Sequence, residues 1–409
     1  MGSLWAALTS GPMKLTRAGV VSITVLTASI LLTACATAAG TQGTSLTAQG
    51  TVASTPRSTA GTARSASDPS RSTERQTPRP LTIAGNPAGH AYVPQAARAV
   101  STSQPNHIIG NGTPASCTSA AVVRAVAEGG VITFSCGPNP VTITMTATAR
   151  VVNTSQQVVL DGGGLVTLSG GGRLQILYMD TCDRRQIWTT NHCINQEWPQ
   201  LVVQNMTLEQ GYSPIQQTPQ TPYGGGGGGA IYAQGGQLKV VDSRFVDNRC
   251  YKIGPDLGGA AIRAISQYSQ SPIYLNGDTF TGGVCSNGGA LSSIGSSWDV
   301  INSVMTGNQA IGWGANPAKP HTPGGGSGGA IYNDGDNYNL TVEGSVIQGN
   351  TAREGGGAIF FVADNHHGAL TINGSTLRDN PSGEFWTRGY PGIFFHSSGH
   401  PIVTHSTIS

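Results

Sequence analysis

Two polar segments near the C-terminus carry residue types suited to acid–base chemistry. Asp364-Asn-His366-His367, together with Arg388, is the best acid–base cluster by composition. Histidine exchanges protons near neutral pH, which suits it to general acid–base catalysis. We take these residues as candidate catalytic groups. A polar loop is the simpler interpretation unless their side chains converge.

Calcium is the one cofactor that the sequence suggests. Asp334-Gly-Asp336-Asn337 places oxygen ligands close together, and Ca²⁺ binds carboxylate and amide oxygens. The same residues also make an ordinary turn, so Asp334 and Asp336 are weak candidate ligands. No cysteine or histidine spacing typical of a zinc site occurs, and we otherwise expect no metal or cofactor.

Several aromatic residues lie in loop-like stretches rich in glycine, proline and asparagine: Trp188, Trp198, Trp313, Trp386 and Tyr390. Of these we take Trp188, Trp313 and Trp386 as candidates for ligand stacking. Exposed indole rings would suit stacking against a sugar or contact with a protein partner. The alternative is that they pack over the edges of the fold. Trp188 lies between Cys182 and Cys193, and a disulfide there would lower the entropy cost of binding.

The composition excludes several classes of protein. Only 10% of the 409 residues are charged, far below what a helical bundle or coiled coil needs. The 58 glycines follow no three-residue period, which excludes collagen. From residue 106 onward 18 acidic residues outnumber 14 basic ones, without a basic stripe, so we expect no nucleic-acid partner.

The first 35 residues form an export signal. Lys14 and Arg17 precede an uncharged apolar run at 18–34, which is too short to span a membrane comfortably. The run ends in Leu32-Thr33-Ala34-Cys35, which resembles a bacterial lipobox and predicts cleavage before Cys35 and lipidation of its thiol. The alternative is ordinary cleavage and release. The protein is therefore expected on the cell surface, lipid-anchored in the membrane, or outside the cell.

Six cysteines remain once Cys35 is set aside, and an even number in an exported chain indicates disulfides. Pairing by proximity along the sequence is our prediction. It gives three bonds: Cys117–Cys136, Cys182–Cys193 and Cys250–Cys285.

Composition divides the chain behind the signal. Residues 36–105 contain few large apolar side chains, so we expect a disordered tether there. Residues 106–409 are expected to fold. One helix is predicted at 116–128, capped by Ser116 or Thr118 and stopped by glycine. Short β-branched, alternating segments follow it and predict strands.

The second half of the chain repeats a two-part unit. Gly-Gly-Ala occurs five times, beginning at Gly228, Gly258, Gly288, Gly328 and Gly356. Four of the copies continue into an apolar residue followed three positions later by asparagine, as in Phe245 and Asn248; in the second copy Gly283 replaces asparagine. Such units must stack to bury a face, which predicts a solenoid. We expect the asparagine to adopt left-handed geometry and its amide to hydrogen-bond along the stack.

These two motifs resemble the repeat pair of chlamydial polymorphic outer membrane proteins and related bacterial β-helix proteins. Residues 130–172 resemble the opening coils of the pectate-lyase-like superfamily. The resemblance covers about 106–409 and implies an all-β, right-handed parallel β-helix with a short N-terminal capping helix. Its members are mainly adhesins or uncharacterised envelope proteins. The superfamily's lyases hold Ca²⁺ on one face with acidic residues, and no acidic pair recurs here at coil spacing.

The expected function is that of an exported cell-surface β-helix, acting as a binding, adhesive or structural module of the envelope. A polysaccharide or a cell-surface protein is the expected partner. The alternative is an enzyme on the same scaffold, namely a lyase or glycoside hydrolase acting on acidic polysaccharide.

Overall fold

The computed structural model describes residues 84–214, 225–315 and 321–409. They belong to one compact unit, Glu74–Ser409. The predicted export signal, Cys35 and residues 36–83 of the expected tether lie outside the described residues. Within the described ranges, no helix is long and apolar enough to cross a bilayer.

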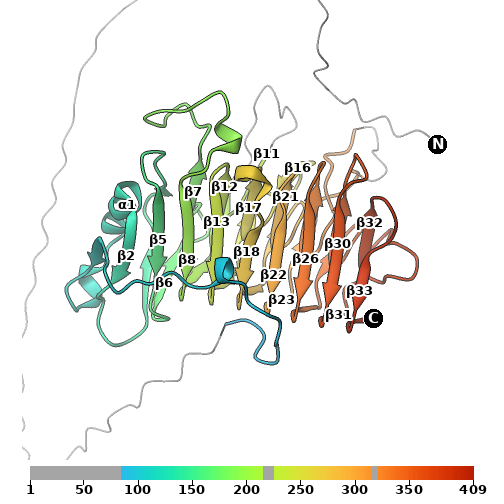
Figure 1. The fold of residues 1–409 in the computed structure, drawn as a ribbon, viewed down its shortest axis with the longest axis horizontal. Helices are drawn as coiled ribbons and strands as arrows, with labels where there is room; N and C mark the ends of the chain where they lie inside the picture. The colour runs from blue at the N-terminus through green and yellow to red at the C-terminus, as the bar shows by residue number, and fades with distance from the viewer. Residues whose placement is uncertain (1–83, 215–224, 316–320) are drawn as a thin grey trace, which may run out of the picture. The chain divides into compact units, whose positions relative to one another are not determined.

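The described chain is a parallel β-helix built on three long sheets, whose strands all pair in parallel (Figure 1). Sheet A contains β1 (His107–Ile109), β2 (Gly130–Phe134), β5 (Gln157–Asp161), β8 (Gln200–Gln204), β13 (Gln237–Val241), β18 (Ile273–Asn276), β22 (Trp298–Ile301), β26 (Asn339–Glu343), β30 (Ala369–Asn373) and β33 (Ile402–Thr404). Sheet B contains β3 (Val141–Thr144), β6 (Val166–Ser169), β9 (Thr207–Glu209), β14 (Arg244–Val246), β19 (Thr279–Thr281), β23 (Val304–Thr306), β27 (Val346–Gln348), β31 (Thr376–Arg378) and β34 (Thr407–Ile408). Sheet C contains β4 (Ala149–Arg150), β7 (Leu177–Asp180), β12 (Ile231–Gln234), β17 (Ile262–Ile265), β21 (Leu291–Ile294), β25 (Ile331–Asp334), β29 (Ile359–Val362) and β32 (Ile393–His396).

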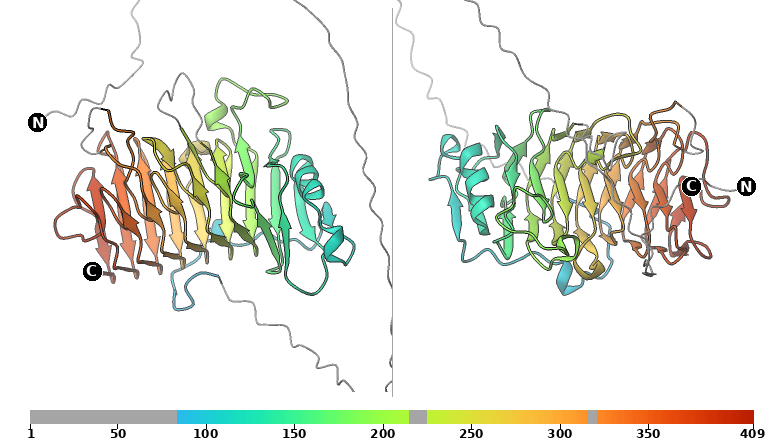
Figure 2. Two further views of the ribbon diagram at one scale, coloured as in Figure 1. Left: turned by 180° about the vertical axis from the view of Figure 1, so that it is seen from behind. Right: turned by 90° about the horizontal axis from the view of Figure 1, so that it is seen from above.

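Two smaller sheets lie on the path from sheet B back to sheet C. Sheet D contains β10 (Tyr212–Ser213), β15 (Arg249–Cys250), β20 (Val284–Cys285), β24 (Gln309–Ala310) and β28 (Thr351–Ala352), and sheet E pairs β11 (Gly225–Gly227) with β16 (Asp256–Gly258). The coils therefore run from sheet C to A and B, and the five central ones also contribute a strand to sheet D. Figure 2 shows the stacked coils from two further sides. Short turns join A to B and B to D in most coils, and the longest loops precede or follow strands of sheet C.

The alternation of side chains along each strand fills the interior of the coils. Phe245 stacks on Phe280 of the next coil, with ring centroids 4.7 Å apart. Met305, Ile347 and Leu377 continue this buried column in register. Burial of apolar side chains between neighbouring coils is the main force that holds such a stack together.

The Gly-Gly-Ala motif forms the corner at which the chain enters sheet C. Its first glycine has a left-handed backbone, for example φ +66° at Gly228, and its alanine methyl is buried in the core. The second copy is shifted by one residue. The amides of Gly229 and Ala230 donate to Ala260 and Ala261, so Ala261 takes the inward position.

The recurring asparagines form an internal ladder at the turn from sheet B to D. The Nδ2 of Asn308 donates to the Oδ1 of Asn350 at 2.8 Å, and Asn350 donates in the same way to Asn380 at 2.9 Å. The predicted hydrogen bonding along the stack is thus confirmed. The prediction that the asparagine itself adopts left-handed geometry is wrong. The residue before each asparagine adopts it, as at Asp247 (φ +51°) and Gly349 (φ +64°).

A second ladder runs along the turn from sheet A to B. The Ser345 amide donates to the Ser375 hydroxyl at 3.0 Å, and Ser303 donates to Ser345 at 2.9 Å. One coil carries Asp278 at this buried position instead of serine. These side chains satisfy the backbone groups that a tight turn leaves without a strand partner.

Helix α1 (Ser119–Glu128) lies at the N-terminal end of the stack, where it packs on β1, β2 and β4 (Figure 1). The Thr118 hydroxyl accepts a hydrogen bond from the Ala121 amide, which is a standard N-cap. The short 3₁₀ helices are η1 (Gln95–Ala97), η2 (Pro114–Ser116), η3 (Cys193–Asn195) and η4 (Tyr268–Gln270).

The structure contains the three disulfides that proximity along the sequence predicts: Cys117–Cys136, Cys182–Cys193 and Cys250–Cys285.

Residues 84–105, which we call the strap, differ from the expectation of a tether. They cross the outer face of sheet A instead (Figure 1). The Gln204 side chain accepts from the Val100 amide at 2.9 Å and donates to the Val100 carbonyl at 2.9 Å. Further along, the Thr102 hydroxyl donates to Asp161 at 3.0 Å. The folded body therefore begins before residue 106.

The strap explains four apolar side chains that point outward from sheet A and are nevertheless buried: Val159, Val202, Val241 and Ile301. They alternate with the inward residues of their strands and lie outside the inner core cluster. η1 packs on β13 and β18. The strap thus adds a second, outer layer of apolar burial to sheet A.

Candidate binding face

The residues proposed for function gather around sheet C. The outward column of this sheet holds aromatic rings in register on adjacent coils. Tyr178 stacks on Tyr232 with ring centroids 5.3 Å apart, and Phe360 stacks on Tyr332 at 4.9 Å. Phe360 is buried, whereas Tyr178 and Tyr232 are half-buried. Phe394 continues the column beyond Phe360 and is half-buried, so accessible rings lie toward both ends of the column.

Both tyrosine hydroxyls donate a hydrogen bond to the side chain two residues further along their own strand. The Tyr178 hydroxyl donates to Asp180 at 3.0 Å, and the Tyr232 hydroxyl donates to Gln234 at 2.9 Å. Burial raises the pKa of Tyr178 and, as the largest cause, also that of Asp180. The tyrosines therefore keep their protons and serve as donors.

Arg150, Tyr178, Asp183, Arg185 and Ile187 form what we call the arginine pocket, an open cavity of about 140 Å³. The Arg150 guanidinium lies 4.4 Å from the centre of the Tyr178 ring and 3.6 Å from Asp183. Arg185 binds the same carboxylate through two nitrogens, the shorter contact being 2.7 Å. These hydrogen bonds from Arg185 lower the pKa of Asp183, so its carboxylate stays ionised.

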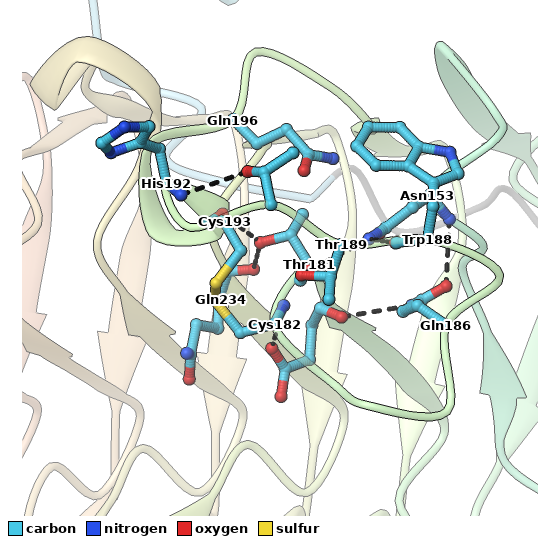
Figure 3. The surroundings of a disulfide bond; sticks show 12 residues. Asn153, Thr181, Cys182, Gln186, Trp188, Thr189, His192, Cys193, Gln196 and Gln234 are labelled. Atoms are coloured by element: carbon cyan, nitrogen blue, oxygen red, sulfur yellow. Dashed lines mark hydrogen bonds between the residues drawn. A yellow bond between two sulfur atoms is a disulfide. The ribbon is translucent and has the colours of Figure 1, made fainter.

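Asp183, Arg185 and Ile187 lie on the loop between β7 and β8. The Cys182–Cys193 disulfide closes this loop (Figure 3). The Asn153 amide donates to the carbonyls of Thr181 and Trp188, at 2.9 Å each. Gln186 donates to the carbonyls of Val151 and Asp180. The Thr181 hydroxyl donates to the Gln234 carbonyl of the next coil at 3.0 Å, so the loop is fixed to the coils on both sides. It presents the half-exposed Trp188 and the Ile187 side chain, 75% exposed.

The predicted acid–base cluster comes together only in part. Asp364, after β29, lies beside Asp336, and its amide donates to the Gly335 carbonyl at 2.9 Å. Asp364 is exposed at the surface; partial desolvation of its carboxyl group raises its pKa, and Asp336 adds to the rise. The His366 ring contacts His396 of the next coil, with centroids 5.0 Å apart. Sequence reasoning had not included His396.

Arg388 lies in the loop that enters β32, whereas Asp364 follows the end of β29. Because the strands are parallel, these positions are at opposite edges of sheet C. Arg388 makes no ion pair with another described residue. His367 is positioned by its own amide, which donates to Asn365 at 3.0 Å.

The candidate calcium ligands lie at the end of β25, where Asp334 is the last residue, and in the turn that follows it, which holds Asp336. Both oxygens of Asp334 accept protein hydrogen bonds, one from the Tyr332 hydroxyl at 2.8 Å and one from the Gly335 amide at 2.9 Å. Asp336 is exposed. Across the described ranges, no three histidine, cysteine or acidic side chains are arranged to hold a metal ion.

The other two tryptophans lie on loops that lead into sheet C. Trp313 is 38% exposed, and the Arg353 guanidinium lies 5.5 Å from the centre of its ring. Trp386 is 53% exposed, in the loop before β32. Both have the accessibility that stacking against a ligand needs.

Sequence reasoning missed the arginine pocket. The charged run Asp183-Arg184-Arg185 between two cysteines was a local signal that could have revealed half of it. Arg150 could not be found in this way, because its partnership with Tyr178 depends on the register of β4 on β7.

Comparison of the chain with protein families, with characterised proteins and with solved structures finds no match.

Proposed function

We propose that this chain is an exported surface module that binds an acidic polysaccharide, with the arginine pocket as the contact for the acidic group. The observation that carries the proposal is the convergence of two guanidinium groups on one ionised carboxylate in an open cavity. Two guanidinium groups thus face the Asp183 carboxylate in the pocket, and the Asp180 carboxyl group lies beside them on the Tyr178 hydroxyl.

The chemistry of the pocket supports a sugar acid over a simple inorganic anion. Arginine forks bind carboxylates through paired hydrogen bonds. The exposed Ile187 side chain and the half-exposed Trp188 ring, on the same loop, offer apolar surface beside the charges. A sugar acid combines a carboxylate with the apolar face of a pyranose ring, so it complements both parts of the site.

The rigidity of the loop supports binding as the role of this site. A loop closed by a disulfide and bonded to neighbouring coils loses little conformational entropy when a ligand binds. The three disulfides are consistent with an oxidising compartment and hence with export. We further propose that the repeats are of the polymorphic outer membrane protein type and that a lipid on Cys35 anchors the module.

Titration of the full chain with polygalacturonate tests the proposal, with dextran as the neutral comparison. We expect Arg150→Ala and Arg185→Ala each to raise the Kd for polygalacturonate about tenfold or more, because each removes a charge-assisted contact. Arg124→Ala is the matched control. It removes an arginine that is 74% exposed on α1 and lies 4.0 Å from Glu128.

Unchanged polygalacturonate binding by both pocket variants would contradict the proposed site, and so would dextran binding that the same two variants weaken equally. The alternative function, cleavage of acidic polysaccharide, is read in the same samples by ultraviolet absorbance. A lyase produces an unsaturated product, so absorbance would rise with time. A binding module leaves the trace flat.

A further inference from the structure

The outer face of sheet A contains a second cavity, of about 350 Å³, which we call the glutamine groove. It is separate from the arginine pocket and shares no residue with it. Ala96 of the strap contributes one wall, and the residues before β18 contribute another. Its volume lies within the range of small-molecule sites.

Three glutamines on successive coils point into the groove: Gln157, Gln200 and Gln237. They are paired in register across β5, β8 and β13, so they repeat at the spacing of parallel strands, about 4.8 Å. Gln237 donates to the Glu197 carbonyl at 3.0 Å. The side-chain amides of Gln157 and Gln200 have no hydrogen-bond partner among the described residues.

Each glutamine amide offers both donor hydrogens and an acceptor oxygen. Lys239 and Tyr274 complete the groove, and both are half-buried. The Lys239 ammonium donates to the Arg98 carbonyl at 2.8 Å and so joins the groove to the strap. The groove therefore combines repeated neutral amides, one cation that already has a partner, and an aromatic ring.

We propose that the glutamine groove binds a neutral, extended oligosaccharide whose successive sugar rings lie over successive coils. Each sugar presents neighbouring hydroxyls that both donate and accept, which matches an amide, and the rise of an extended polysaccharide is comparable to the spacing of the coils. Tyr274 provides a ring for stacking. This site goes beyond the proposed acidic-polysaccharide function, because its ligand carries no charge.

The chemistry of the groove argues against other ligand classes. Phosphate recognition relies on several converging cations or backbone amides, and Lys239 is the one cation that lines this cavity. A lipid chain needs an apolar cavity, whereas glutamines line this one. A polymer with repeated hydroxyl pairs fits both the amides and their spacing.

Isothermal titration of the full chain with cellohexaose, chitohexaose and xylohexaose tests the proposal. We expect at least one of the three to bind and Gln200→Ala to raise its Kd about tenfold, because Gln200 is the central amide. Gln348→Ala is the matched control. Gln348 lies on β27 of sheet B, far from the groove in the coil path.

Far-UV circular dichroism and thermal unfolding verify that Gln200→Ala keeps the fold. Absence of binding heat with all three oligosaccharides overturns the proposal, and so does an unchanged Kd for the folded Gln200→Ala variant. A failure here is distinguishable from a failure of the proposed function, because polygalacturonate binding is measured separately at a site with no residue in common.

Discussion

Asp278 stands, in one coil, at the buried corner position that serine holds in neighbouring coils. Its Oδ1 accepts the Ser243 amide at 2.8 Å, and its amide donates to the Ser303 hydroxyl at 3.0 Å. Its Oδ2 has no partner among the described residues. Complete burial is the largest cause that raises the pKa of Asp278 well above its usual value, and nearby Asp242 adds to the rise. The folded chain therefore retains a proton here that the unfolded chain releases.

Replacing Asp278 by serine should stabilise the protein at neutral pH. The folded wild type binds more protons than the unfolded chain above about pH 4, so its free energy of unfolding falls as pH rises. Serine has no carboxyl group to titrate, so the free energy of unfolding of the variant does not fall with pH for this reason. We expect Asp278→Ser to gain about 1–3 kcal/mol at pH 7, the usual cost of an unsatisfied buried polar group, with the difference shrinking toward pH 4. Urea unfolding at both pH values measures it, and a difference independent of pH would disprove the mechanism.

Asn350 illustrates what a residue pattern can predict. Its recurrence indicated a stacked amide, which the structure has, because its Oδ1 accepts from Asn308 and its Nδ2 donates to the Met305 carbonyl at 3.0 Å. Which residue of the turn takes the left-handed conformation was not predictable from that pattern. Aspartate, asparagine and glycine all tolerate it, and they occupy adjacent positions here.

Asn350→Ala should destabilise the protein by about 3 kcal/mol. The change leaves the Asn308 amide and the Met305 carbonyl buried without their partner. Asn339→Ala is the control, because Asn339 is exposed and water can replace its hydrogen bond to Ala369. Urea unfolding of the two variants compares them. Equal losses would show that the internal ladder contributes no more than a surface amide.

At the scale of elements, the helix and the repeated strands were predictable, whereas the strap was not. The helix has a cap, an apolar face and a glycine stop within one short segment. The strap has no apolar periodicity, and its partners are remote. Val100 bonds to a residue 104 positions away, and Asn86 bonds to one 258 positions away. Local composition therefore indicated disorder where tertiary contacts impose order.

Gln204→Ala should loosen the strap without unfolding the solenoid. The variant loses two hydrogen bonds to Val100 and one to Asp161, so the free energy for local opening should fall by about 1–3 kcal/mol. Trypsin should then cleave after the exposed Arg98 about tenfold faster. Gln348→Ala serves as control. Cleavage at the wild-type rate would mean that the strap is held mainly by its apolar contacts.

At the scale of the whole molecule, stacking makes the parts of the fold interdependent. Each coil buries its apolar column against the next, as Phe245 does on Phe280, so no coil is stable alone. The repeated motifs were sufficient to predict the solenoid from the sequence. The arginine pocket and the glutamine groove depend on which residues of successive coils face each other, and that register is fixed only by the complete stack.

The proposed lipid anchor also concerns the whole molecule, although Cys35 lies outside the described residues. Cys35→Ala should move the protein from the membrane fraction to the soluble fraction, because a lipidated cysteine would be its attachment. Immunoblots of both fractions measure this. The disulfide cysteines stay unchanged, so the folded body is preserved. Undiminished membrane association of the variant would argue against lipidation.

The strap also has a mechanical consequence. Its contacts extend along the stack, from the Asn302 turn, through Lys239 and Gln204, to Asp161. The strap residues that make these contacts all lie between residue 84 and β1, the first strand of sheet A. A pulling force that enters from the N-terminal side therefore loads the strap before it reaches any strand of the solenoid. Under such a force the strap would detach first, and this would release chain length while the coils remain folded.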